Sequence, residues 1–371
     1  MNRLKIAFIH NYYIHYRVPL FEALVQKYNV FFFFDAIHPY VTRISGKVNF
    51  KVPRSLHAFN ETVPLLLWYY LIKGKFRLFV AGDATRLSTI MAYVVSRLLR
   101  KPYVLWEERW VFSAGFRNNL KWPIVRLISL NADAIIVPGS KSKEFYEKLG
   151  ISINRVFIAP NASYAETSRT STIKAQELKD TIGSDEKIII LYLGRVTKIK
   201  QVHILLKAFA QLCNNNQNNL CLIIAGEANR EYKVELDNLS KDFRLCNVYF
   251  AGFVNENEKG SYLQLADIVV YPSVLEVWGL VINEAMFAGK PVISTTSSGG
   301  ACDLIEDKVN GYLIPPGNVE VLYDRLKRLL DNPKLIKTFG EAARKTIEQG
   351  FTYSHMLSGF EKALRYALDN T

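Results

Sequence analysis

The sequence predicts an α/β protein with two doubly wound, Rossmann-like domains. Short, continuously apolar segments alternate with segments of helical periodicity, which is the pattern of a parallel sheet covered by helices on both faces. This alternation stops in a polar stretch and then restarts, and 371 residues exceed the size of one ordinary domain. Ligands of such sheets bind beyond the carboxyl ends of the strands. We therefore expect the two domains to face each other across a cleft.

The first half of the chain contains five predicted strands. Each is short and rich in β-branched or aromatic residues. Helical patterns such as "RLSTIMAYVVSRLLR" (86–100) separate them. The predicted strands are 4–10, 30–36, 76–82, 102–108 and 132–139.

A polar segment, "NASYAETSRTSTIKAQELKDTIGSDEK", predicts a linker, with or without a short helix. We expect a first domain over 1–165, a linker over 166–186 and a second domain over 187–350. We expect the amphipathic helix in 351–371 to pack back on the first domain. The predicted strands of the second domain are 188–194, 220–226, 248–254, 268–273, 291–296 and 311–317.

The positive charge of the chain lies in its first half. The net charge is +13, and residues 1–160 hold 23 Lys and Arg against 9 Asp and Glu, which gives +14. Such asymmetry indicates a polyanionic partner, either nucleic acid or an anionic lipid surface, or else a merely soluble basic surface. The segment "LKWPIVRLISL" (120–130) adds a basic amphipathic patch.

The longest apolar run is "VPLLLWYYLI" (63–72), followed by "KGKFR". It is shorter than the ~18 residues that a membrane span needs. Its pattern fits a buried helix or strand, or an interfacial segment with aromatic and basic anchors. Four scattered cysteines and the absence of a secretory signal favour a reducing cytoplasm.

Two acids in "EVWGLVINEAMFAGKPVIS" (276–294) need an explanation. In a helix from Gly279 to Gly289, Glu284 lies on the apolar face, where an unpaired carboxylate costs several kcal/mol. Glu276 lies eight residues earlier, in the loop after a predicted strand.

A nucleotide sugar would account for both acids. The N–H groups of Gly279, Leu280 and Val281 at the helix start would bind phosphate. Glu284, about 7 Å along the helix, would accept hydrogen bonds from ribose hydroxyls, and Glu276 would bind a second polyol. The alternative is a buried salt bridge at Glu284 and a surface acid at Glu276.

The loop "GRVTKIK" follows the predicted strand 188–194 and supplies cations. Arg195 and Lys200 suit phosphate binding at a strand end. The alternative is a solvated basic loop.

The stretch "YPSVLEVWGLVINEAMFAGKPVIST" resembles the E-x7-E region of retaining glycosyltransferases of the GT-B fold, family 4 (group 1). The resemblance extends through "LGRVTKIKQVHILLKAF", "LIIAGE", "VYFAGFV" and "SSGGACDLIEDKVNGYLIPPG", and so over nearly all of residues 188–332. It implies that Arg195 and Lys200 bind the diphosphate, Glu276 the donor sugar and Glu284 the ribose. It also implies a helix start under the phosphates and contacts to the base. The positions concerned are Gly279, Leu280 and Val281 for the phosphates, and Glu227, Phe253 and Val254 for the base.

The resemblance implies a metal-independent, retaining enzyme with no cofactor besides its nucleotide-sugar substrate. In the first half, Glu107 and Glu108 follow a predicted strand and are candidates to orient an acceptor hydroxyl. The alternative is that they are surface acids paired with Arg109. Many relatives have a glycine pair after the first strand, whereas this chain has "HNYYIHYR" (10–17), in which His10, His15 or Arg17 would substitute. Gln201 replaces a usual glycine.

The leading hypothesis is transfer of a sugar from a nucleotide-diphosphate sugar to a glycan or lipid-linked acceptor in polysaccharide or glycolipid synthesis. We expect a cytoplasmic protein, peripheral on the anionic inner face of the plasma membrane and not bound to nucleic acid. One alternative is a GT-B nucleotide-sugar epimerase or phosphorylase. Another is a basic nucleic-acid-binding α/β protein, which leaves Glu284 unexplained and lacks the usual signatures.

Overall fold

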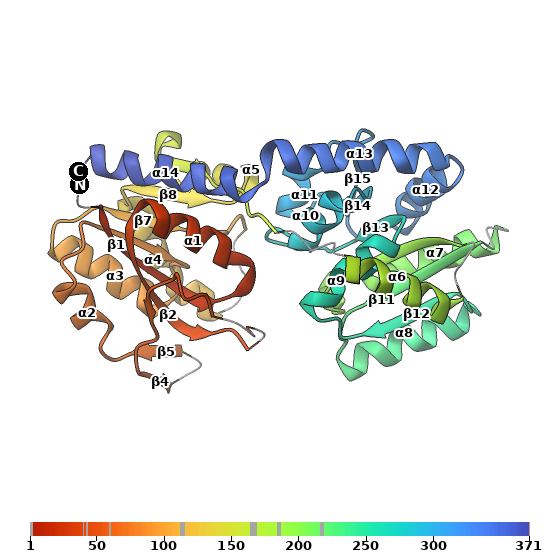
Figure 1. Cartoon of the computed structure of the whole chain (residues 1–371), viewed down its shortest axis with the longest axis horizontal. Coiled ribbons are helices and arrows are strands. Elements are labelled where there is room, and N and C mark those ends of the chain that lie inside the picture. The colour runs from red at the N-terminus through yellow and green to blue at the C-terminus, as the bar shows by residue number, and fades with distance from the viewer. Residues whose placement is uncertain are drawn as a thin grey trace. The chain divides into compact units, whose positions relative to one another are not determined.

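The structure is a computed structural model that describes residues 3–39, 41, 44–58, 61–111, 116–163, 169–183, 187–215 and 219–370. It divides into two compact units, one of residues 1–161 with 353–371 and one of residues 162–352. Each unit has a central parallel sheet with helices packed on it (Figure 1). The predicted α/β class with two Rossmann-like domains is confirmed.

Seven parallel strands form the sheet of the first unit, in the order β3-β2-β1-β6-β7-β8-β9. All five predicted strands of this half are present, while the short β3 and β9 and the antiparallel pair β4–β5 were not predicted. The strands are β1 (Lys5–Tyr13), β2 (Asn29–Ile37), β3 (Phe50–Lys51), β4 (Ser55–Ala58), β5 (Glu61–Pro64), β6 (Leu78–Gly82), β7 (Tyr103–Trp106), β8 (Ala134–Val137) and β9 (Val156–Ile158).

Helices cover both faces of this sheet. Successive side chains of β1 point to opposite faces, so Phe8 joins one core and Ile9 the other. Helices α1 and α14 pack on the side of Phe8, and α2, α3, α4 and α5 pack on the side of Ile9. The helices are α1 (Val18–Lys27), α2 (Leu67–Lys73), α3 (Leu87–Leu98), α4 (Phe116–Asn131), α5 (Ser140–Lys148) and α14 (Tyr353–Asp369), with short 3₁₀ turns η1 (His15–Arg17) and η2 (Ile153–Arg155).

Helix α14 completes the first unit, although the whole second unit separates it from β9 in sequence. The ring of Phe360 lies 5.0 Å from that of Trp106 and 6.2 Å from that of Phe8. Gly359 approaches the end of β9 so closely that an added Cβ would lie 2.3 Å from the carbonyl oxygen of Ile158.

The apolar run 63–72 forms the end of β5 and most of α2. Neither a buried helix or strand nor an interfacial segment, the two expectations, describes all of it. Leu67 and Leu71 are buried against the sheet, as a core helix requires. The outer face of α2 and the turn before it stay exposed and carry large apolar side chains. These are Leu65, Leu66, Trp68, Tyr69 and Ile72. Among the described residues, no helix is both long and apolar enough to cross a membrane.

The second unit contains a six-stranded parallel sheet in the order β12-β11-β10-β13-β14-β15. All six predicted strands are present. They are β10 (Ile188–Leu193), β11 (Leu220–Ala225), β12 (Val248–Gly252), β13 (Ile268–Tyr271), β14 (Val292–Thr295) and β15 (Gly311–Ile314).

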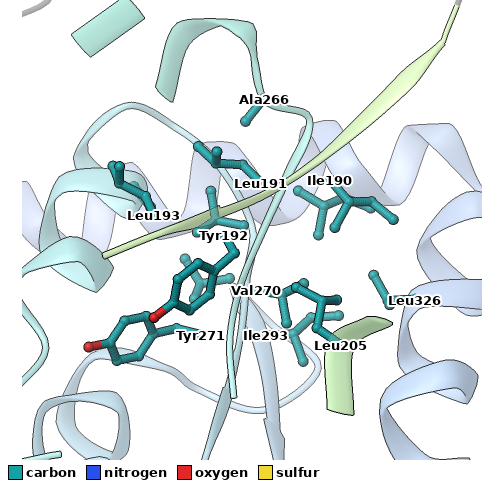
Figure 2. Packing of buried hydrophobic residues seen from close by; sticks show 14 of the residues in the cluster. Ile190, Leu191, Tyr192, Leu193, Leu205, Ala266, Val270, Tyr271, Ile293 and Leu326 are labelled. Atoms are coloured by element: carbon teal, nitrogen blue, oxygen red, sulfur yellow. The ribbon is translucent and has the colours of Figure 1, made fainter. Parts of the chain in front are cut away.

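The core of this unit surrounds β10, in which every residue after Ile188 is buried. Figure 2 shows part of this core, where side chains of β10, β13 and β14 pack with Leu205 of α7 and Leu326 of α12. The helices are α6 (Arg169–Ile182), α7 (Val202–Asn214), α8 (Arg230–Asp242), α9 (Glu256–Leu265), α10 (Leu280–Phe287), α11 (Gly299–Leu304), α12 (Val319–Leu330) and α13 (Pro333–Gly350), with the 3₁₀ turn η3 (Lys198–Lys200).

The predicted linker 166–186 is not a free connection. Helix α6 occupies most of it and packs against α9 within the second unit. Ala175 is buried and Ile182, seven residues later on the same helix face, packs against the core. The polar composition hid this narrow apolar stripe. Residues 166–168 and 184–186 of the predicted linker lie outside the described residues.

Candidate functional site

The carboxyl ends of β10 and β13, the two central strands of the second sheet, lie at a topological switch point. The chain runs outward from β10 to β11 and β12, and then returns to the other side of β10 with β13. The loops after β10 and β13 therefore turn away from each other and leave room for a ligand. Arg195 and Lys200 lie in the first loop, and Glu276 and Gly279 lie in the second.

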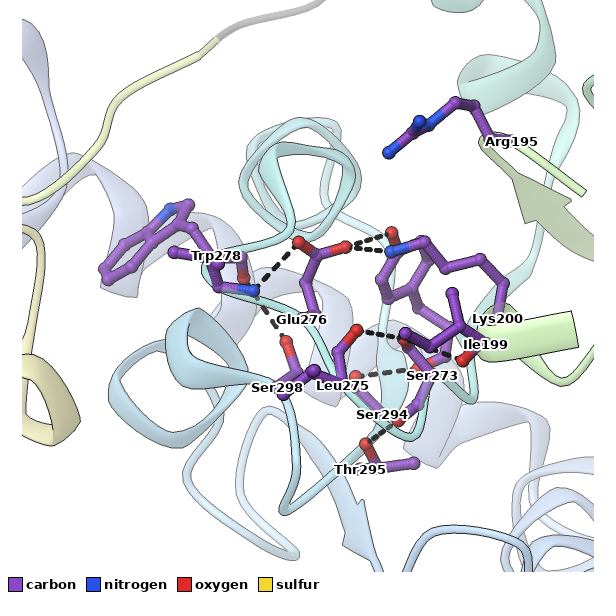
Figure 3. Close-up of polar contacts among 12 residues, drawn as sticks. Arg195, Ile199, Lys200, Ser273, Leu275, Glu276, Trp278, Ser294, Thr295 and Ser298 are labelled. Carbon is purple, nitrogen blue, oxygen red and sulfur yellow. Dashed lines mark hydrogen bonds and ion pairs between the residues drawn. The ribbon is translucent and has the colours of Figure 1, made fainter. Parts of the chain in front are cut away.

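Lys200 and Glu276 bind each other at this switch point (Figure 3). Lys200 Nζ forms an ion pair with Glu276 Oε2, which also accepts a 2.7 Å hydrogen bond from the Tyr271 hydroxyl. Glu276 Oε1 accepts a 2.9 Å hydrogen bond from the Val277 N–H. Burial alone would raise the pKa of Glu276, but Lys200 and these hydrogen bonds outweigh it and hold the pKa below its usual range. The alternative of a solvated surface acid is wrong for Glu276.

Arg195 and Glu227 lie on adjacent loops. Both side chains are exposed, and Figure 3 draws Arg195 without an interaction to the other residues shown. The two loops touch, because the Val196 N–H donates a 2.9 Å hydrogen bond to the carbonyl oxygen of Glu227. A Cβ on Gly226 would lie 1.8 Å from the carbonyl oxygen of Gly194, so this approach requires glycine.

Gly279 precedes α10 in a left-handed conformation, with φ of 86°. The predicted helix start is therefore correct to one residue. Because α10 begins at Leu280, the N–H groups of Leu280 and Val281 have no acceptor within the helix, whereas the Ile282 N–H donates a 2.8 Å hydrogen bond to the carbonyl oxygen of Gly279. Leu280 and Val281 are half-buried. A Cβ on Gly279 would lie 3.3 Å from Cγ of Glu276 and crowd the acid.

Glu284 is buried as predicted, with 1% of its surface exposed, but it is not isolated. Its Oε1 accepts a 2.7 Å hydrogen bond from the Ser163 hydroxyl and lies 3.6 Å from Lys259 Nζ. The expectation of a carboxylate without protein partners is wrong, and the salt-bridge alternative holds for this oxygen. Oε2 is buried and has no hydrogen-bond partner among the residues that the structure describes. Burial raises the pKa of Glu284, and Lys259 opposes that rise.

The two residues predicted to hold the base lie farther along the sheet. Phe253 and Val254 follow β12, the edge strand two places from β10. The Phe253 ring is 54% exposed.

A cavity lies at the switch point of the first unit. Here the chain runs from β1 outward to β2 and later returns to the other side of β1 with β6. The cavity has a volume of about 150 Å³ and opens between β1, η1 and the residues that follow β6 and β7. Its lining residues are His10, Asn11, Arg17, Asp83, Trp106, Glu107 and Glu108.

Arg17 is the central cation of this cavity and is 7% exposed. Its Nη2 donates a 2.7 Å hydrogen bond to Glu108 Oε1, and its guanidinium lies 4.1 Å from the ring centre of Trp106. Asn161 Nδ2 donates a 3.0 Å hydrogen bond to the same oxygen of Glu108. The alternative of a surface acid paired with Arg109 is therefore wrong for Glu108.

Glu107 is buried beneath the cavity, with 6% of its surface exposed. It accepts hydrogen bonds of 3.1 Å from the Ala84 N–H and 3.2 Å from the Glu108 N–H. Burial and the nearby Asp83 carboxylate raise the pKa of Glu107 to about 7, although Arg109 and the two N–H groups oppose the rise.

His10 is buried next to Trp106, with ring centres 4.8 Å apart. Burial and the Arg17 charge lower the pKa of His10 well below its usual value, so the ring is neutral at pH 7. His15 lies in η1, and its ring packs against Tyr16, 5.5 Å away. It does not line the cavity.

The sequence analysis missed Asp83 and Lys259. Asp83 directly follows a predicted strand, and that position was a usable signal. Lys259 lies inside a polar helix and gave none. No cluster of three or more His, Cys, Asp or Glu side chains able to hold a metal ion occurs in the described part of the chain.

Comparison with known families finds a match within the second unit. A sequence profile of the family described as "Glycosyl transferases group 1" matches residues 174–346. These residues, slightly less than half of the chain, are similar to the group 1 glycosyltransferases. The match covers α7 to α12 and both loops that carry Lys200 and Glu276.

Proteins similar to this chain carry glycosyltransferase names. O-antigen chain mannosyltransferase C of Escherichia coli is 29% identical over 184 residues, which are 49% of this chain and 47% of that protein. Lipopolysaccharide 1,2-N-acetylglucosaminetransferase of Salmonella typhimurium is 27% identical over 250 residues, 64% of each chain. The chain thus matches about half to two thirds of the length of these relatives. The glycosyltransferase hypothesis is favoured over the nucleic-acid-binding alternative.

The fold of the whole chain resembles solved GT-B glycosyltransferases. A crystal structure of Anabaena Alr3699/HepE in complex with UDP has a TM-score of 0.82 at 19% identity, covering 98% of this chain and all of that one. The structure of WaaG, a glycosyltransferase involved in lipopolysaccharide biosynthesis, has a TM-score of 0.71 at 18% identity, covering 95% and 98%. At such identities the likeness shows a shared fold.

Proposed function

We propose that the protein is a retaining, metal-independent glycosyltransferase. It transfers a sugar from a nucleoside-diphosphate sugar to a hydroxyl of a glycan or lipid-linked acceptor in polysaccharide or glycolipid synthesis. One observation carries the proposal: a group 1 domain places the buried Lys200–Glu276–Tyr271 cluster and the α10 start at its switch point.

The roles follow from charge and position. When the donor binds, Lys200 releases Glu276 and pairs with the diphosphate instead. The exposed Arg195 adds a second cation. The first N–H groups of α10 stabilise the leaving phosphate as its negative charge develops. Glu276, released from Lys200, accepts hydrogen bonds from hydroxyls of the transferred sugar. Glu284 Oε2 accepts a hydrogen bond from a ribose hydroxyl. Cations and helix N–H groups replace a metal.

Titration with nucleotides tests this proposal. UDP is the first choice, because the HepE structures contain UDP, UDP-glucose, or UDP with glucose. A ligand at 100 times its Kd adds about 2.7 kcal/mol of stability. We expect UDP or GDP to raise the melting temperature of the chain, and the matching sugar nucleotide to be hydrolysed slowly without an acceptor. Absence of both effects with all common nucleotides would refute the proposal.

We further propose that the first unit contacts an anionic membrane surface through the outer face of α2. Trp68 and Tyr69 are 52% and 47% exposed there, and Lys73 and Lys75 follow them. Glu61 is the only acid between Asp35 and Asp83, a stretch that holds seven Lys and Arg. Aromatic side chains flanked by lysines suit the interface of an anionic bilayer.

Vesicle co-sedimentation tests this contact. Binding to vesicles with anionic lipid should fall with added salt and should weaken in a Trp68→Ser/Tyr69→Ser variant. Val234→Ser on α8, which removes an exposed apolar side chain from the other unit, should bind as the wild type does. Equal binding of both variants would exclude α2 as the contact.

A further inference from the structure

The cavity of the first unit has the size and chemistry of a sugar subsite. We propose that it binds one uncharged sugar ring of the acceptor and rejects acidic or phosphorylated rings. This inference rests on the proposed function and specifies its acceptor. The cavity lies at the switch point between β1 and β6, which is where a doubly wound sheet offers a binding site.

The size of the cavity suits a single ring. The cavity measures about 150 Å³. Cavities of that order hold one six-membered ring, or about five waters at ~30 Å³ each. A glycan could place its terminal residue here, with the rest of the chain outside.

The lining offers hydrogen-bond donors and acceptors side by side. Arg17 Nε and Nη1 are buried donors that make no hydrogen bond of ordinary geometry with the described residues, although the Tyr16 side chain lies near the guanidinium. His10 Nδ1 lies 3.3 Å from the carbonyl oxygen of Tyr12, so it carries the proton, and Nε2 is left as an acceptor. The carboxylates of Glu107 and Glu108 are further acceptors. A sugar hydroxyl both donates and accepts, so a ring of hydroxyls satisfies this mixture better than a group that only accepts.

The charge of the cavity excludes an anion, although the surrounding unit is basic. The carboxylates of Asp83 and Glu108 line it against the one guanidinium of Arg17, and Glu107, with its pKa raised to about 7, is about half ionised at pH 7. Arg17 is already neutralised by Glu108 at 2.7 Å. A phosphate or uronate would have to displace Glu108 and then face Asp83 and the partly ionised Glu107. A neutral ring avoids both costs.

Backbone strain at the cavity supports a functional role. Asp83 has a φ of 62°, in the left-handed region that L residues other than glycine rarely adopt. Its Oδ1 is fixed by hydrogen bonds of 3.1 Å from the Thr85 N–H and 2.5 Å from the Thr85 hydroxyl. Strain of this kind persists where a side chain must be held at a site.

The test measures binding of single rings to the full chain by saturation-transfer NMR and calorimetry, with UDP present. The probes are a methyl hexoside, the matching methyl uronide and the matching hexose phosphate. The variants are Arg17→Met, Glu108→Gln and the control Glu147→Gln, an exposed acid of the same unit. UDP binding is measured in the same samples.

We expect the neutral ring to bind the wild type more tightly than either acidic ring. Arg17→Met should weaken neutral-ring binding about tenfold, the effect of losing one charge-assisted hydrogen bond. Glu108→Gln frees the Arg17 charge, so the uronide should gain about tenfold relative to the neutral ring. Glu147→Gln should behave as the wild type. If Arg17→Met does not fold, Glu108→Gln alone decides, because it retains the guanidinium.

Three results would overturn the inference. One is that no ring binds while UDP does, which leaves the proposed function intact. Another is an acidic ring that binds the wild type at least as tightly as the neutral one. The third is displacement of the ring by an intact nucleotide sugar but not by a longer acceptor glycan, which would assign the cavity to the donor's sugar. Loss of UDP binding itself would count against the proposed function and not against the selectivity of the cavity.

Discussion

Replacing Lys200 by Met tests the ion pair on which the donor site depends. The side chains of Lys200 and Glu276 are 7% and 19% exposed, so solvent screens their attraction weakly. Removing one partner of a fully buried pair costs about 3–5 kcal/mol. Glu276 would keep its hydrogen bonds from Tyr271 and Val277, so the loss should be nearer the 1.5–3 kcal/mol of one charged hydrogen bond, or about 2 kcal/mol. For a unit of this size the melting temperature should fall by roughly 4–8 °C.

The loss of stability in Lys200→Met should also depend on pH. Lys200 helps to hold the pKa of Glu276 below its usual range. A carboxyl with a lowered folded-state pKa stabilises the fold above its unfolded pKa of ~4.3 and loses that contribution as pH falls through the folded value. The difference between wild type and Lys200→Met should therefore be full at pH 7 and shrink below about pH 4.

The assay is a double-mutant cycle by thermal or urea unfolding, with Glu276→Gln and the double variant. Glu276→Gln leaves a buried ammonium and should also destabilise, whereas the double variant should lose less than the sum of the two. UDP should raise the melting temperature of the wild type but raise that of both Lys200→Met chains less. Additive losses, or an unchanged melting temperature of Lys200→Met at pH 7, would refute the reasoning.

Further predictions concern the other acids and the metal. Glu107→Gln removes a carboxyl whose pKa is raised to about 7. The folded wild type keeps the proton of this carboxyl above pH 4.5, where the unfolded chain loses it. Urea titrations should therefore show the stability of the wild type falling relative to that of the variant between pH 5 and 8, by up to about 3 kcal/mol. A parallel pH profile for both chains would contradict this. Glu284→Ala should abolish transfer and weaken UDP binding in calorimetry while the circular dichroism spectrum persists, because Lys259 keeps its 2.9 Å pair with Glu256. Full turnover by a folded variant would remove Glu284 from the ribose site. Turnover and UDP affinity should survive excess EDTA, and a loss restored by Mg²⁺ would disprove metal independence.

The sheets were predictable because their signal is local. An unbroken apolar run such as "IIILYL" in β10 fits only a strand covered on both faces. The switch points follow from strand order, and order depends on contacts between distant segments. The sequence could place Lys200 and Glu276 after strands, but their mutual ion pair appeared only in the folded chain.

Prediction failed where composition and environment disagreed. The segment around α6 is polar, so the sequence left its helix open, and among the helix's described side chains Ala175 is buried and Ile182 packs against the core of the second unit. Glu284 was correctly placed in the core, but its partners are Ser163 and Lys259, which lie 121 and 25 positions away in the sequence. Glu108 pairs with Arg17 across 91 positions, whereas Arg109 is next to it in sequence. Sequence neighbours are a poor guide to the partner of a buried charge.

The position of α14 constrains how the chain is made. Met356, Phe360 and Ala363 close the face of the first sheet that carries Phe8 and Trp106. During translation this face, which α1 covers only in part, lacks α14 until all of residues 162–352 have been synthesised. Nascent chains stalled before Tyr353 should therefore recruit chaperones to their oldest part. A chain released at that point would aggregate through its first sheet even with the second unit fully folded.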